Sequence, residues 1–356
     1  MSHLEERLEH DLTEIRDHIA KMGSEVEKSL NRAFRALEKN DDKLAFKTIL
    51  SDLPINRHMR QIDRLCHAFI AIHLPSAGHL RLISSVIRAN IILERIGDYA
   101  VTIAREAVQL GDVPEGYMSK QLKKVSGEAI AVLSEAISSF NSSNAERARH
   151  AITMARQVEH EMDGIYAELL EAGDGCSRNT MNYLIIFSQL KRVADQAKNL
   201  AEEAIFIETG ESKQPKVYRI LFLDDDNSCL GPMAAAIADK AYHDQGQFTT
   251  AGKTPADSLD SNMVAFMQGR GFNLSEVTTR RLEASREALS EFHVIVGLNQ
   301  KVMKAVGKIP FRTSALNWKN LEIPADDDAT AWESLYKNLA LQIRELMELL
   351  RGNEAA

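Results

Sequence analysis

The feature that most constrains the fold of this chain is an internal repeat in its first part. The run LERIGDYA at 93–100 is matched by LKRVADQA at 190–197, and the match continues on both sides at a constant offset of 97 residues. A repeat of about 100 residues indicates that one supersecondary unit is built twice. We therefore predict a first domain over residues 1–212, made of two repeats at about 1–112 and 113–212.

The spacing of apolar residues predicts that both repeats are helical. Along the first segment they recur every three or four positions, which is the period of one helix face. Turn-forming residues interrupt the pattern near 40–42, 74–78, 111–114, 141–143 and 173–175. The six segments between these breaks have about 30 residues, or about 45 Å of helix each, a length typical of antiparallel bundles. We predict two tandem three-helix bundles, with Pro54 kinking the second segment because proline removes a backbone donor.

The pattern changes after Pro215. Short β-rich apolar runs stand at 217–223, 294–298 and 313–318, and helical patterns begin at Pro232 and cover 331–350. Strands that alternate with helices are typical of an α/β sheet, here expected to be parallel and doubly wound. The predicted fold is thus multidomain: all-α tandem three-helix bundles followed by an α/β domain over 216–356.

Composition excludes several classes of function. The chain has 51 acidic and 43 basic residues, a net charge of −8, which disfavours non-specific binding to nucleic acid. No apolar run approaches the ~18 residues that span a bilayer, and the first residues do not form a signal peptide. Three cysteines far apart make neither a disulfide framework nor a zinc motif. We expect a cytoplasmic protein.

The histidines are unevenly distributed: nine of the eleven lie in the first part of the chain.

Two carboxylates in the first repeat could carry chemistry. Glu94 and Asp98 are four residues apart, so on a helix they share one face, and apolar residues surround them in sequence. Two carboxylates so placed can share a hard cation. In the second repeat the same positions hold Lys191 and Asp195. A solvated or capping role remains the alternative.

The run at 93–100 resembles the signature of the PhoU family, whose members regulate phosphate uptake and signalling, and tandem three-helix bundles match the architecture of that family. The resemblance implies metal ions (Fe, Zn, Mn or Mg) on a Glu-x-x-x-Asp-x-x-x-Asn helix motif in each repeat and on acids of the preceding helix, with no organic cofactor. The matching positions are Asp63, Glu94, Asp98, Glu159, Asp163, Asp195 and Asn199. This chain departs from the motif at Met59, Thr102 and Lys191, and an ammonium group at the last position would repel a cation.

The same resemblance implies how such a protein would work. Its partners would be a phosphate transporter complex and a membrane sensor kinase, which it would approach from the cytoplasm and bind through the surface of the bundle. Metal ions would order the helices. Whether two copies form a homodimer is left open.

A second motif, FLDDDNSCLGPMA at 222–234, follows a predicted strand and enters a predicted helix, a geometry that cradles phosphate. It resembles the phosphate loop of low-molecular-weight protein tyrosine phosphatases and arsenate reductases, in which a Cys nucleophile is followed six positions later by Arg. The degenerate loop consists of Asp224, Asn227, Ser228, Cys229 and Leu230. Asp224 takes the nucleophile position and Leu230 the arginine position, so both the attacking thiolate and the guanidinium are lost. We therefore expect a pseudophosphatase that serves interaction or sensing and has no catalytic residues.

An alternative remains for the same motif. An apolar strand that runs into three aspartates also resembles Mg²⁺-dependent phosphatases of the haloacid dehalogenase type. Asp224 would then be the nucleophile, and the acids at 326–328 would help to bind Mg²⁺. That hypothesis leaves the run NSCLGPMA without an explanation.

Overall fold

The computed structural model describes residues 3–171, 178–211, 216–299, 301–310, 312–324 and 328–351. The chain divides into two compact units, residues 1–214 and 215–356. Each unit has its own hydrophobic core.

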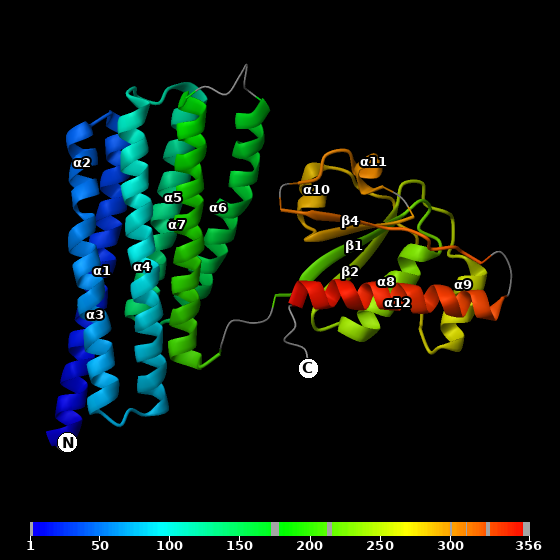
Figure 1. Cartoon of the computed structure of the whole chain (residues 1–356), viewed down its shortest axis with the longest axis horizontal. Coiled ribbons are helices and arrows are strands. Elements are labelled where there is room, and N and C mark those ends of the chain that lie inside the picture. The colour runs from blue at the N-terminus through cyan, green and yellow to red at the C-terminus, as the bar shows by residue number, and fades with distance from the viewer. Residues whose placement is uncertain are drawn as a thin grey trace. The chain divides into compact units, whose positions relative to one another are not determined.

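The first unit is a set of long helices that lie side by side (Figure 1). In chain order they are α1 (His3–Lys39), α2 (Asp42–Leu50), α3 (Asp52–Ile72), α4 (Ala77–Leu110), α5 (Gly116–Asn141), α6 (Ala145–Glu171) and α7 (Arg178–Thr209). The first repeat comprises α1 to α4, and the second comprises α5 to α7. Four of the expected breaks separate these helices, and the fifth, at 173–175, lies outside the described residues.

The kink expected at Pro54 is instead a complete break one turn earlier. Helix α2 ends at Leu50 and α3 begins at Asp52, which puts Pro54 in the first turn of α3, where its missing N–H removes no helical hydrogen bond. Arg32 of α1 donates to the Ser51 hydroxyl at the break, with an Nη2–Oγ distance of 2.9 Å. The second predicted segment is therefore two helices rather than one bent helix.

The repeated sequence accounts for how the two repeats join. Helix α4 packs against α7, and Ile96 and Ala100 of α4 are buried in the same core as Val193 and Ala197, their counterparts in α7. Because these positions point inward, the acidic positions of the repeat lie on another side of each helix. Glu94 and Asp195 are accordingly half-buried and Asp98 is exposed.

The second unit is the predicted α/β domain. Its sheet is parallel throughout and has the order β2-β1-β3-β4. The strands are β1 (Tyr218–Asp224), β2 (Gly246–Gly252), β3 (Val294–Leu298) and β4 (Ser314–Trp318), and the helices are α8 (Leu230–Tyr242), α9 (Ser261–Gly269), α10 (Arg286–Ser290), α11 (Val302–Val306) and α12 (Ala329–Arg351). Sequence analysis missed β2.

Alternate residues of β1 face opposite sides of the sheet. Ile220 and Phe222 are buried in the core that includes α8 and α12, whereas Leu221 and Leu223 are buried in the core on the other face, beside α10 and α11. The sheet is thus covered on both faces, as in a doubly wound fold. From β1 the chain passes first to β2 on one side and later to β3 on the other, so the loop after β1 lies at the switch point where such folds bind ligands. Among the described residues, no helix is long and apolar enough to cross a membrane.

Candidate functional site

The predicted carboxylate pair on α4 has a third member that sequence reasoning missed. Asp52, the first residue of α3, lies within hydrogen-bonding reach of Asp98. Although Asp98 is exposed, the neighbouring helix removes part of its solvation, and this desolvation, followed by the charge of Asp52, raises the pKa of Asp98. Burial and then the charges of Asp98 and Asp52 raise the pKa of Glu94. Crowded carboxylates of this kind favour either a bound proton or a bound cation.

Asp63, one of the positions implied by the resemblance, takes part in a hydrogen bond between helices. Its Oδ1 accepts a hydrogen bond of 2.9 Å from Asn90 Nδ2, which also donates to the Met59 carbonyl at 2.9 Å. Asn90 is fully buried and stands one helical turn before Glu94 on α4. The structure thus gives Asp63 a hydrogen bond that joins α3 to α4.

In the second repeat the lysine substitution is accommodated by an ion pair. Lys191 Nζ donates to Asp195 Oδ2 at 2.6 Å, one turn apart on α7. The ammonium group of Lys191, which would repel a cation, therefore neutralises the carboxylate of Asp195. Glu159 on α6 and Asn199 on α7 are half-buried, and the side chain of Asp163 lies outside the described residues.

Another acidic pair, also missed from sequence, joins α5 to α6. Glu128 and Glu161 are within hydrogen-bonding reach of each other, and burial followed by the charge of Glu161 raises the pKa of Glu128. Lys124 Nζ lies 2.7 Å from Glu161 Oε1. No motif marks these residues, because they come together only through the packing of two helices.

Asp224, the last residue of β1, is turned inward. It is 4% exposed, and its Oδ2 accepts a 2.8 Å hydrogen bond from the backbone N–H of Gly231, in the first turn of α8. Burial raises the pKa of Asp224 to about 6, against the opposing effect of the N–H groups of Gly231 and Asn227. A side chain at position 231 would crowd this contact, because its Cβ would lie 2.9 Å from Asn227 Oδ1 and 3.3 Å from Asp224 Oδ2.

The other loop residues hold its shape. Asn227 is fully buried with a left-handed backbone (φ 55°), and Ser228 donates from both its N–H and its Oγ to Asp226 Oδ1, at 3.0 and 2.9 Å. Cys229 is buried, and burial raises the pKa of its thiol far above the ordinary value. Leu230 is 3% exposed within the core. The loop therefore presents neither a thiolate nor a guanidinium to a ligand.

A duplicated helical bundle with acidic residues at repeated positions on α4 and α7 defines the class of the first unit. The PhoU domain family matches this chain at residues 19–107 and 122–204. The phosphate-specific transport system accessory protein PhoU homolog of Pseudomonas aeruginosa is 33% identical over 215 residues, which cover 58% of this chain and 88% of that protein. The chain belongs to the PhoU family.

Solved structures give the same result for the first unit. The crystal structure of PhoU from Pseudomonas aeruginosa matches with a TM-score of 0.55 and 31% identity, over 57% of this chain and 99% of that chain. For the second unit, the structural neighbours include the tyrosine phosphatase Wzb from Escherichia coli K30, with a TM-score of 0.32 and 14% identity, over 38% of this chain and 99% of that chain.

Proposed function

We propose that this protein is an accessory regulator of phosphate transport that acts by binding other proteins from the cytoplasm. The observation that carries the proposal is the match to PhoU over both helical repeats, at 33% identity with a homologue named for the phosphate-specific transport system. Its partners would be the phosphate transporter complex and the sensor kinase of the phosphate response. The buried core shared by α4 and α7 is consistent with this role, because it joins the two repeats into one unit that could present a continuous surface to a partner protein.

The first test is genetic and uses the full chain. Deleting the gene should leave a phosphate-starvation reporter active even in phosphate-rich medium, and wild-type protein should restore its repression. An Asp224→Asn variant should restore repression equally well, because the proposed role needs no nucleophile. Loss of repression by this variant, with the protein present at wild-type levels, would instead favour the Asp224-based phosphatase.

In this proposal, the Asp224 carboxylate of the second unit takes the place that a bound phosphate would occupy. The Asp224 carboxylate takes the hydrogen bond from Gly231, a donor in the first turn of α8 that would otherwise be available to an oxyanion. A buried carboxylate held in this way is also poorly placed to attack a phosphate ester. Of the acids that the Mg²⁺-dependent alternative requires, residues 326 and 327 lie outside the described residues. We expect no turnover of p-nitrophenyl phosphate with or without Mg²⁺, and Mg²⁺-dependent turnover that Asp224→Asn abolishes would overturn this assignment.

At the family positions of this chain, the first repeat offers the better ligands for a metal ion. Glu94 and Asp98 lie four residues apart on α4 with Asp52 in reach of Asp98, whereas Lys191 on the second repeat already forms an ion pair with Asp195. A cation bound on the first repeat would relieve the repulsion between these acids and tie the start of α3 to α4. We propose that any metal bound at the family position of this chain is held by the first repeat.

Elemental analysis of protein purified without chelator tests this proposal. A Glu94→Gln/Asp98→Asn variant should lose most of the Fe, Zn, Mn or Mg attributable to this site, because amides are weaker ligands than carboxylates. An Asp195→Asn variant is the matched control and should retain the metal. Equal metal content in all three proteins would contradict the proposal.

A further inference from the structure

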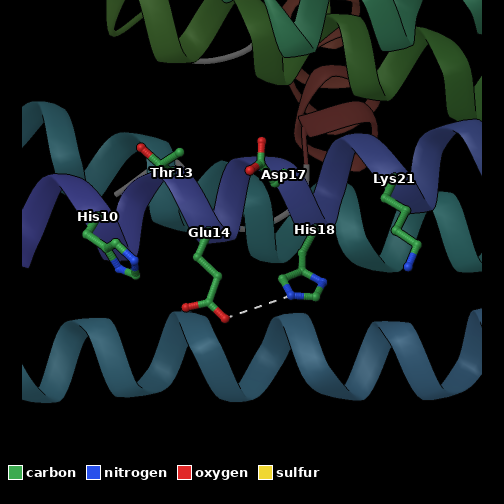
Figure 2. A pocket seen from close by; sticks show the side chains of 6 residues that line it. All are labelled: His10, Thr13, Glu14, Asp17, His18 and Lys21. Atoms are coloured by element: carbon green, nitrogen blue, oxygen red, sulfur yellow. Dashed lines mark ion pairs between the residues drawn. The ribbon is translucent and has the colours of Figure 1, made fainter.

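Histidines are concentrated at the contact between α1 and α3, and the proposed function uses none of them. His10 and His18 belong to α1, His58 belongs to α3, and His73 caps the C-terminus of α3. Six residues of α1 line a hollow of about 420 Å³ on this helix: His10, Thr13, Glu14, Asp17, His18 and Lys21 (Figure 2). Figure 2 shows the side chains of His10, Glu14 and His18 extending toward the same side of the helix.

At one end of this row, three potential ligands converge. His10, Asp11 and Glu14 each offer one ligand atom, and these atoms all lie within 4.8 Å of one another. The distance from His10 Nδ1 to Asp11 Oδ1 is 3.4 Å. His10 and Glu14 are four residues apart, the spacing with which two side chains of one helix hold a single metal ion.

A neighbouring histidine orients the Asp11 carboxylate. The second oxygen of Asp11, Oδ2, lies 2.8 Å from Nε2 of His73, whose side chain is 6% exposed and which packs on Phe69. Carboxylates that bind metals are in turn generally hydrogen-bonded to an outer group, which fixes their direction. Glu14 Oε1 lies 3.9 Å from His18 Nε2, and Nδ1 of His18 lies 2.8 Å from Nε2 of His58 on α3.

The chemistry of these ligands selects the kind of metal. One imidazole nitrogen with two carboxylate oxygens is a set used by Zn²⁺ and its neighbours in the first transition row, whereas Mg²⁺ and Ca²⁺ prefer oxygen alone. We propose that His10, Asp11 and Glu14 bind a divalent transition-metal ion, preferably Zn²⁺, at a site separate from the carboxylates on α4. Because Asp11 is hydrogen-bonded to His73, the ion would tie the N-terminal part of α1 to the residue that caps the C-terminus of α3.

The test is calorimetric titration of the full-length protein with ZnCl₂ in chelator-free buffer containing excess Mg²⁺, which competes for sites made of oxygen alone. A His10→Ala/Glu14→Gln variant should bind Zn²⁺ at least tenfold more weakly than wild type, since even outer-shell changes cost 10- to 100-fold in affinity. A Glu94→Gln/Asp98→Asn variant should keep the Mg²⁺-resistant Zn²⁺ binding. A His150→Ala variant, which removes an exposed histidine of α6, should also keep it.

Equal Zn²⁺ affinity in wild type and the His10→Ala/Glu14→Gln variant would overturn the proposal, as would wild-type protein that binds no Zn²⁺ in the presence of Mg²⁺. Circular dichroism of the variants would reveal a change in folding, and an NMR measurement on the wild-type protein tests the proposal independently of the variants. In wild-type protein, Zn²⁺ should shift the imidazole ¹⁵N resonances of His10 and leave those of His150 in place. Binding of Zn²⁺ without a shift at His10 would likewise overturn the proposal.

Discussion

An Asp224→Asn variant should be more stable than the wild-type protein above pH 6 and should lose that advantage near pH 4. Burial raises the pKa of Asp224 from 3.8 to about 6. A carboxyl group with a higher pKa in the folded state makes stability fall as pH rises from about 4 to about 6, and stability stays lower above that range. Asparagine does not ionise, and its amide oxygen can still accept the hydrogen bond from Gly231. At about 1.4 kcal/mol per pKa unit, the variant should gain up to about 3 kcal/mol at pH 8.

Tryptophan fluorescence can follow this effect in the second unit alone. Trp318 and Trp332, the two tryptophans of the chain, both belong to that unit. Urea unfolding of variant and wild type at pH 4.5 and pH 8 gives the difference in the free energy of unfolding at each pH. Asp239→Asn, on the exposed side of α8, is the control and should give nearly the same difference at both pH values. A destabilised Asp224→Asn variant at pH 8 would contradict the expectation.

If, as expected, the Asp224 carboxylate reduces stability at neutral pH, its presence needs a reason other than stability. Natural sequences depart from optimal stability mainly at functional or strained sites. Asp224 satisfies a backbone donor in the first turn of α8, at the switch point of the sheet. The stability that the Asp224 carboxylate costs is consistent with the proposal that this residue holds the loop in place and that the loop does not bind phosphate.

The sequence was sufficient to predict the helices because their signal is local. Apolar spacing and the 97-residue repeat predicted long helices in two tandem bundles, and the structure has them. Strand β2 was missed because Gly246–Gly252 is an edge strand with partly exposed residues, so it carries no continuous apolar run. Pro54 was interpreted as a kink because the pattern around it stays helical. Its position in the first turn of α3 depends on the break at Ser51.

The sequence predicted only those members of the candidate site that lie on a single helix. Glu94 and Asp98 share a face of α4 by their spacing alone, and this pair is visible in the sequence. Asp52 joins them through the packing of α3 on α4, and Glu128 meets Glu161 through the packing of α5 on α6. Contacts of this kind depend on the register between helices, which no short motif encodes. The same limit applies to the pairing of Asp11 with His73, which are 62 residues apart.

A Gly252→Ala variant should lose about 3 kcal/mol of stability in the second unit. A Cβ at the end of β2 would lie 2.7 Å from the backbone nitrogen of Asn227 and 2.8 Å from the carbonyl carbon of Asp226. These are main-chain atoms of the loop that follows β1, so no side chain can rotate away to make room. Overpacking a close contact costs about 1–3 kcal/mol, and the upper end applies where backbone meets backbone.

Urea unfolding followed by tryptophan fluorescence also measures this effect. Gly269→Ala, in the last turn of α9, is the matched control because its added Cβ meets no described atom within 4 Å. It should leave the free energy of unfolding unchanged within about 0.5 kcal/mol. If Gly252→Ala were as stable as this control, the loop could not be packed against the end of β2 as it is in the structure. The inward position of Asp224 would then lose its support, because the same loop, pressed between β2 and α8, holds that carboxylate against Gly231.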